Sequence, residues 1–116
     1  MPKLIGKLDS LTLAVADMSR SVKFYRDVLG FKVDYKSPGW SELKAGNFYI
    51  GMYHDKPKKA GGGPLPVFVV GNIKKAAADL KKKRVKFLEG PYEEDYGWLA
   101  VFVDPDGYQY ELFQEK

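Results

Sequence analysis

The fold of this 116-residue chain is decided by one stretch of sequence, VADMSRSVKFYRDVLGF, at residues 15–31. An alternating run from Leu8 to Val15 leads into it, and this period of two indicates a half-buried strand. Asp17 is a candidate helix N-cap, with Ser19 as the alternative, and apolar residues then recur at helical spacing. Gly30 should end the helix in the left-handed conformation, and alternation resumes as a strand from Phe31 to Lys36. The stretch therefore predicts a strand, a helix and a second strand.

The remainder of the chain adds strands and then repeats the opening order. A Gly-, Pro- and Lys-rich segment at residues 55–64 can hold neither helix nor strand, which makes it a linker. After it, Asn72 is a candidate N-cap and the spacing predicts a helix over Ile73–Lys83. The acidic segment from Gly90 to Asp95 is expected to be a loop, which is either simply solvated or gates a cleft. The further expected strands are Trp40–Lys44, Phe48–His54, Leu65–Val70, Arg84–Leu88, Gly97–Val103 and Tyr108–Gln114.

This order amounts to an internal repeat. Residues 15–18 (VADM) correspond to residues 70–73 (VGNI), and both precede a predicted helix. We therefore predict a single α+β domain over residues 1–116, built from two tandem βαβββ modules at residues 8–54 and 65–114. One helix can cover only one face of each four-stranded sheet. The other faces of two curved mixed sheets are then expected to enclose a cleft.

Composition excludes several classes of protein. Apolar residues make up 45% of the chain and charged residues 29%, which is ordinary for a globular domain. The absence of cysteine excludes disulfides, iron–sulfur clusters, thiolate zinc sites and thiol nucleophiles. His54 is the single histidine and no nucleophile elbow accompanies it, so a solvated imidazole is expected rather than a catalytic triad. No apolar run approaches the roughly 20 residues of a membrane helix. Residues 1–7 lack a signal-peptide core, so the expected compartment is the cytosol.

The net charge of +4 raises the question of a nucleic-acid partner. The basic run Lys81–Arg84 follows two further lysines of the same predicted helix. Cations are favoured near a helix C-terminus by the helix dipole, and single-strand binders interleave aromatic side chains with their basic groove, which this run does not. A solvated helix face is therefore expected, with no nucleic-acid partner and no membrane partner.

Two motifs give the chain a family resemblance. The first, Val15-x-Asp17-x-x-x-Ser21-x-x-Phe24-Tyr25-x-x-x-Leu29-Gly30-Phe31, resembles the first-module signature of the glyoxalase, bleomycin-resistance and dioxygenase superfamily, also called the vicinal oxygen chelate fold. The second, Asp104-Pro105-Asp106-Gly107-x-x-x-Glu111-Leu112, resembles the closing motif of that family. The two modules cover nearly the whole chain. The resemblance implies the family's fold, whereas its function needs separate evidence because one fold hosts many chemistries.

The resemblance also implies where metal enzymes of this family hold their ion. Their four ligand positions, usually His, Gln or Glu, correspond here to Ser10, Gly51, Leu65 and Glu111. Only Glu111 is a competent ligand, and a divalent cation needs several donors to offset its desolvation. We therefore expect no metal and no other cofactor.

The predicted cleft face carries small, polar and aromatic side chains on which a planar ligand would stack. The leading hypothesis is a metal-free protein that binds or sequesters a neutral or anionic aromatic small molecule. The alternative is a lyase, isomerase or dioxygenase-like enzyme with an atypical metal site or none, in which Glu111 is the base. The aromatic side chains could instead fill a core or the interface of the expected homodimer. The candidate ligand-binding residues are Ser10, Thr12, Trp40, Tyr49, Tyr53, Trp98, Phe102, Glu111 and Phe113.

Overall fold

The computed structural model describes residues 8–57 and 65–116, which belong to two compact units. The boundary between the units lies between Pro57 and Lys58, within the predicted linker. Most of that linker lies outside the described residues, as does the N-terminal segment 1–7. None of the helices in the described ranges has the length and apolarity that crossing a membrane requires.

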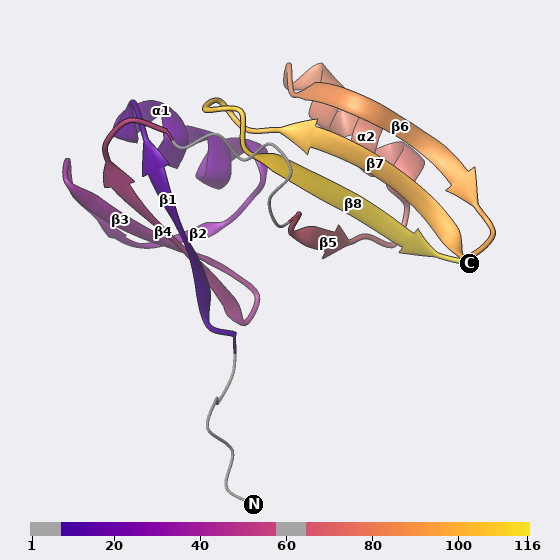
Figure 1. The fold of residues 1–116 in the computed structure, drawn as a ribbon, viewed down its shortest axis with the longest axis horizontal. Coiled ribbons are helices and arrows are strands. Elements are labelled where there is room, and N and C mark those ends of the chain that lie inside the picture. The colour runs from indigo at the N-terminus through magenta and orange to yellow at the C-terminus, as the bar shows by residue number, and fades with distance from the viewer. Residues whose placement is uncertain (1–7, 58–64) are drawn as a thin grey trace, which may run out of the picture. The chain divides into compact units, whose positions relative to one another are not determined.

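The first unit is a four-stranded mixed sheet with a helical segment on one face (Figure 1). The strand order is β1-β4-β3-β2, in which β1 runs parallel to β4 and the other neighbours are antiparallel. The predicted βαβββ order of the first module is confirmed. Its elements are β1 (Ser10–Val15), α1 (Met18–Lys23), the π-helical turn η1 (Phe24–Val28), β2 (Lys32–Lys36), β3 (Trp40–Ala45) and β4 (Phe48–His54).

The helical segment of this unit begins and ends where its sequence predicts. The Asp17 carboxylate accepts a hydrogen bond of 3.0 Å from the backbone N–H of Arg20, which confirms Asp17 as the N-cap. The segment widens into one π turn, in which the Leu29 N–H donates to the Phe24 carbonyl at 3.1 Å. Gly30 then turns the chain away at a φ of +80°, a conformation that glycine adopts without steric cost.

The helical segment packs its apolar side against β3 and β4. Val22 and Tyr25 on the helical side, and Leu43 and Ile50 on the strands, have no solvent exposure. Burying each such side chain contributes roughly 1.5–3 kcal/mol. Because strand side chains alternate, all of this burial lies on one face of the sheet, and the opposite face is left for other use.

The second unit repeats the architecture with a longer helix. Its strand order is β5-β8-β7-β6, β5 runs parallel to β8, and helix α2 lies behind the sheet in Figure 1. The predicted two-module α+β fold is therefore confirmed. The elements are β5 (Val67–Val69), α2 (Ile73–Lys82), β6 (Lys86–Glu94), β7 (Gly97–Val103) and β8 (Gln109–Glu115).

Helix α2 is tied to its sheet at its first turn. The Asn72 side chain accepts a hydrogen bond from the Lys75 N–H at 3.1 Å, as the sequence predicts for an N-cap. The Gln114 side chain of β8 accepts a second one, of 2.7 Å, from the Ile73 N–H. Since the first N–H groups of a helix have no partner within it, these two side chains satisfy donors that would otherwise need water.

The closing motif forms a tight turn between β7 and β8. The buried Asp104 carboxylate accepts hydrogen bonds from the backbone N–H groups of Asp106, at 2.9 Å, and Tyr108, at 2.8 Å. Gly107 follows with a φ of +92°. The turn therefore needs an aspartate at its start and a glycine at its end, which explains the sequence pattern.

The prediction of a loop from Gly90 to Asp95 is wrong, because Gly90–Glu94 belong to a strand. Strand β6 runs through Gly90 and Pro91 to Glu94 and pairs with β7 as far as Glu94 opposite Gly97. Its register shifts twice, between Phe87 and Glu89 and again before Tyr92. Such irregularities accommodate a proline in an edge strand, because the missing N–H falls where the ladder is already interrupted.

Candidate functional site

The open face of the first sheet gathers the residues that the sequence assigned to it. The β1–β4 register pairs Ser10 with Tyr49, and the β3–β4 register pairs Trp40 with Tyr53. Thr12 lies in the next row of the same face, opposite Gly51. The predicted common face of these side chains is therefore confirmed, whereas their role in ligand binding stays a prediction.

A pocket of about 240 Å³ lies on this face. Four of the predicted ligand-binding residues line it, while Tyr53 of the same face does not. Sequence reasoning missed Asp9 and Asp34. Asp34 lies at a register shift between Val33 and Tyr35, and simple alternation cannot foresee such a shift. The lining residues are Asp9, Ser10, Thr12, Asp34, Trp40, Glu42, Tyr49 and Gly51.

The indole of Trp40 forms a wall of this pocket. Its Nε1–H donates a hydrogen bond of 3.0 Å to Oε1 of Glu42, two residues along the same strand. Its six-membered ring lies over Gly51 of the neighbouring strand, so that a Cβ atom built on Gly51 would lie 2.6 Å from Cη2 of Trp40. Real Cβ atoms essentially never approach that closely, so this position of the indole requires glycine at residue 51.

Lys44 is a cation at the edge of the same face. It pairs with Tyr49 across β3 and β4, and its Nζ lies 5.8 Å from the centre of the Tyr49 ring. This distance is within the range of a cation–π contact. The phenol ring of Tyr49 is thus in contact with a charged group of the protein itself.

The open face of the second sheet carries two of the remaining predicted residues. Glu111 pairs with Val67 on β5 and with Val101 on β7, and Phe113 lies in the next row, opposite Leu99. Both side chains are partly exposed. The Phe113 ring stacks on Tyr96 with centroids 6.1 Å apart. Glu111 and Phe113 therefore share a face, as the sequence predicts.

Two predicted residues lie on the other face of this sheet. The register pairs Phe102 with Tyr110 and Trp98 with Gln114, whose side chain binds the start of α2. Phe102 has no exposure, and its ring lies 5.6 Å from that of Tyr110 and 5.9 Å from that of Phe87. The prediction that Trp98 and Phe102 share a face with Glu111 was wrong. Strand β7 carries apolar side chains on both faces, so its alternation does not reveal which face the helix covers.

Trp98, on the helix-covered face, lies beside an ion pair between Lys116 and Glu93. The Lys116 Nζ lies 5.5 Å from its ring centre and 2.7 Å from Oε2 of Glu93, the register partner of Trp98. The hydrogen bond and charge of Lys116 lower the pKa of the Glu93 carboxyl. These contacts give Trp98 a structural setting at the end of the sheet.

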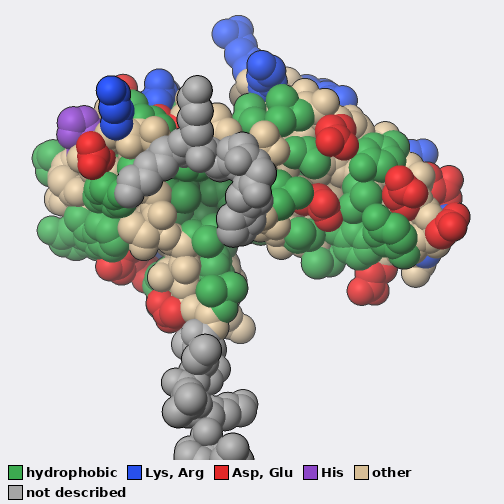
Figure 2. All heavy atoms as spheres, in the orientation of Figure 1, with side chains coloured by type: hydrophobic (Ala, Val, Ile, Leu, Met, Phe, Trp, Pro, Cys, Tyr) green, Lys and Arg blue, Asp and Glu red, His purple; other side chains and the backbone are tan. Residues whose placement is uncertain are grey.

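A second carboxylate lies two strands from Glu111. Glu89 on β6 pairs with Val101, which separates it from Glu111 on the same row. The Tyr92 hydroxyl donates a long hydrogen bond of 3.4 Å to Oε2 of Glu89. Desolvation, followed by the charge and hydrogen bonding of Glu89, raises the pKa of the Tyr92 phenol. In Figure 2 this unit shows hydrophobic side chains interspersed with acidic ones.

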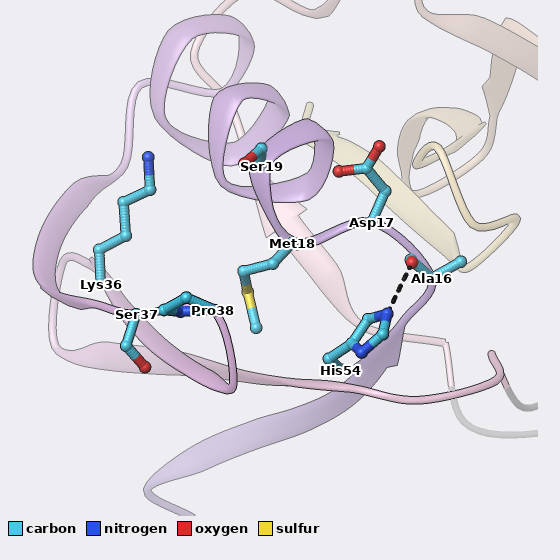
Figure 3. Close-up of a pocket in the computed structure, with 8 residues that line it drawn as sticks. All are labelled: Ala16, Asp17, Met18, Ser19, Lys36, Ser37, Pro38 and His54. Atoms are coloured by element: carbon cyan, nitrogen blue, oxygen red, sulfur yellow. Dashed lines mark hydrogen bonds between the residues drawn. The ribbon is translucent and has the colours of Figure 1, made fainter.

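A larger pocket of about 560 Å³ lies at the start of α1 (Figure 3). Met18 projects into it between the turn at Ser37–Pro38 and the imidazole of His54. The His54 Nε2 lies 3.2 Å from the Ala16 carbonyl oxygen, and the side chain is exposed. The single histidine is thus exposed, as the sequence predicts, and one of its ring nitrogens has a backbone partner.

The residues at the four implied metal positions do not fit an ion. Gly51 has no donor, and the Trp40 ring occupies the space into which a side chain there would extend. Leu65 precedes β5 and also lacks a donor, which leaves the Ser10 hydroxyl and the Glu111 carboxylate. Within residues 8–57 and 65–116, no three His, Cys, Asp or Glu side chains are grouped as a metal site would need.

Comparison with known proteins agrees with the architecture. The family model described as Glyoxalase/Bleomycin resistance protein/Dioxygenase superfamily matches residues 7–112. Mitochondrial methylmalonyl-CoA epimerase of Mus musculus is 35% identical over 119 residues, covering 87% of this chain and 67% of that protein.

Solved structures of the same fold extend the match to the whole chain. TnmS3, an antibiotic binding protein from Streptomyces sp. CB03234, has a TM-score of 0.79 at 22% identity and covers 99% of this chain and 100% of its own. A glyoxalase family protein from Bacillus anthracis has a TM-score of 0.81 at 20% identity, with both chains fully covered. At these identities the likeness shows the fold alone, whereas the family model spans most of the sequence. The chain therefore belongs to the glyoxalase/bleomycin resistance protein/dioxygenase superfamily.

Proposed function

We propose that this protein binds or sequesters a small aromatic molecule without a metal. The observation that carries the proposal is the pocket on the open face of the first sheet, where Trp40 and Tyr49 supply aromatic surface and Ser10 and Thr12 supply hydroxyl groups. Ligand pockets typically combine apolar and aromatic walls with a few polar groups that fix orientation. TnmS3, an antibiotic binding protein with the same fold, supports a binding role.

The size of the pocket limits what it can hold. Its volume of about 240 Å³ is below the roughly 300–1,000 Å³ typical of pockets for drug-sized ligands. We infer that it takes one planar group of a ligand rather than a whole drug-sized molecule. In the second unit, taken by itself, Glu111 and Phe113 of the open face remain proposed as ligand-binding residues.

The charge of the pocket narrows the ligand class. Among the described residues, the carboxylates of Asp34 and Glu42 and the side chain of Asp9 line the pocket and no lysine or arginine does, while Lys44 lies over the Tyr49 ring at the edge of the same face. An anionic group placed among these carboxylates would meet like charge, which costs free energy when water is displaced. Of the neutral and anionic ligands expected from the net charge of the chain, the neutral class therefore fits this pocket better.

A second candidate function is an isomerase reaction. It is favoured by the 35% identity with an epimerase, and it would use Glu111 as the general base. Glu89 lies in the same row of the sheet, two strands away, which corresponds to roughly 10 Å between backbones. A carboxylate at that distance could return a proton to a substrate held between the two groups.

Tryptophan fluorescence tests the binding proposal. Protein purified without a metal-affinity step is titrated with a panel of neutral aromatic antibiotics and metabolites, with ethylenediaminetetraacetate present. Saturable quenching that Trp40→Ala abolishes and Trp98→Phe leaves intact is expected. Quenching absent across the panel would contradict the proposal.

Glu111→Gln separates the two candidate functions. This nearly isosteric change should leave binding of a neutral ligand close to that of the parent. If Glu111 is instead a catalytic base, the same change should remove turnover while binding is retained, since such groups contribute roughly 10²–10⁴-fold. Turnover of methylmalonyl-CoA that is lost in Glu111→Gln would favour the isomerase.

We further propose that the protein forms a homodimer in the cytosol. The second unit has exposed apolar side chains at Val67 and Val69 on the edge strand β5, with 50% and 72% of their surface accessible. Exposed edges of this kind are liabilities that association removes. Light scattering at micromolar concentration should give twice the chain mass, and the mass of a monomer would refute the dimer.

A further inference from the structure

We propose that Glu42 is the positioning residue of the ligand site, holding the six-membered ring of Trp40 over Gly51 as the specificity-determining wall of the pocket. The proposal deepens the proposed function, because that wall lines the pocket to which the ligand is assigned. Glu42, Trp40 and Gly51 act as one unit, in which the indole covers one of the four implied metal positions.

The Trp40 indole does not lie over its own register partner. Trp40 pairs with Tyr53 in the register, yet its six-membered ring lies over Gly51, which comes two residues before Tyr53 in β4. Diagonal contacts of this kind are within the reach of large aromatic side chains. The ring therefore leans along the sheet in one definite direction, toward the position opposite Glu42.

A hydrogen bond to Glu42 holds the indole in that direction. Glu42 lies on the same face of β3, and its Oε1 accepts the Nε1–H at 3.0 Å. A hydrogen bond to a carboxylate is shorter and stronger than a neutral one, and it orients the nitrogen side of the ring along the strand. Cζ2 and Cη2 follow Nε1 along the same edge of the indole, so the hydrogen bond at Nε1 also constrains where these two atoms lie over Gly51.

Gly51 has no side chain, and this leaves room for the Trp40 ring. A Cβ on Gly51 would lie 2.6 Å from Cη2 and 2.9 Å from Cζ2 of Trp40. The bicyclic ring of Trp40 is rigid and is held by Glu42, so it cannot relieve this clash by a local change of its own shape. Any larger residue at 51 would lift the indole into the pocket or break its hydrogen bond.

These contacts have a consequence for specificity. Because Trp40 lines the pocket, the part of its indole face that is open to the pocket is a plane on which an aromatic group can stack. The Glu42–Trp40–Gly51 unit therefore favours a planar organic ligand.

The experiment uses the full chain with Trp98→Phe, which leaves Trp40 as the single tryptophan. Acrylamide quenching and the emission maximum report the position of the indole without any ligand. Glu42→Gln retains an oxygen acceptor and should behave as the parent does. Glu42→Leu removes the acceptor and should increase quenching and shift the emission. Equal behaviour of Glu42→Gln and Glu42→Leu would overturn the positioning role.

A double-mutant cycle tests the close contact between the Trp40 indole and Gly51. Gly51→Ala should displace the ring and change its quenching, whereas Gly51→Ala in a Trp40→Ala background should cost no stability because the clash is gone. Gly71→Ala is the matched control, since a Cβ at Gly71 has nothing within 4 Å. If Gly51→Ala alone fails to fold, recovery in the double variant still supports the proposal. Unchanged Trp40 quenching in folded Gly51→Ala would refute it.

The binding of a ligand is measured separately from the position of the indole. The neutral dye N-phenyl-1-naphthylamine is titrated into each variant, and Glu42→Leu and Gly51→Ala should raise its Kd by up to about tenfold, the upper end for loss of an aromatic stack. Retained spectroscopic effects with no dye binding to the parent would leave the Glu42–Trp40–Gly51 geometry standing and count against the proposed function. Dye binding that is equal in every variant would count against the specificity role.

Discussion

Phe102 and Phe113 are a matched pair of phenylalanines whose truncation should have opposite consequences. They lie on neighbouring strands of the second sheet, on opposite faces. Phe102 has no exposure and packs against Tyr110 and Phe87, whereas Phe113 is partly exposed and stacks on Tyr96. The face assignment thus decides which of the two is core and which is available to a ligand.

The magnitudes follow from these surroundings. Phe102→Ala should destabilise the protein by about 3–5 kcal/mol, the usual cost of emptying a phenylalanine site in a core. At roughly 3–6 °C per kcal/mol for a chain of this length, the melting temperature should fall by about 10–30 °C. Phe113→Ala loses one ring stack and part of a side chain's burial, and it should cost less, about 1–3 kcal/mol.

Urea unfolding followed by circular dichroism measures both values. A ligand arm uses the milder Phe102→Leu and Phe113→Leu, which are expected to remain folded. Phe113→Leu should weaken binding of the aromatic ligand found in the fluorescence screen, and Phe102→Leu should not. Equal destabilisation by the two alanine variants, or a larger loss for Phe113→Ala, would refute the assignment of faces.

Three further outcomes are expected. Asp17→Ala and Asn72→Ala should each cost about 1 kcal/mol in urea unfolding, because each removes an N-cap acceptor; Asn72→Asp, which retains an acceptor, should cost less. Ethylenediaminetetraacetate should leave the melting temperature unchanged, whereas a native-state metal at a hundredfold excess over its Kd would contribute about 2.7 kcal/mol and its removal would be visible. The pKa of Glu93 is lowered by Lys116, so this pair supports folding above the ordinary glutamate pKa and its contribution is lost as the pH falls through the depressed value. Carboxyl titration by NMR should show the Glu93 pKa rising in Lys116→Met, and an unchanged value would contradict the ion pair.

Local signals in the sequence sufficed for the order of elements and for the family. The N-caps at Asp17 and Asn72 and the left-handed Gly30 each depend on a few neighbouring residues, so their chemistry can be read from adjacent positions. The face of the first sheet was also predictable. Its strands carry aliphatic residues on one side and polar, small or amphipathic aromatic ones on the other, which fixes the direction of each side chain.

The second sheet shows where that reasoning stops. Strand β7 is apolar on both sides, so sequence alternation could not tell that Phe102 faces α2 while Leu99 and Val101 face away. Strand β6 continues through Gly90 and Pro91 because two register shifts interrupt its pairing, and such shifts depend on the partner strand.

Residue identity and spacing along the chain were enough to establish the repeated βαβββ order, the superfamily, and the lack of donor side chains at two of the four implied metal positions, Gly51 and Leu65. These are properties of residue identity and of spacing along the chain, which folding does not alter. The tertiary structure alone decided that the Trp40 indole crosses to Gly51 and is held there by Glu42. That arrangement joins two strands through a clearance of a few ångströms, and only the register and the lean of one ring fix such a distance.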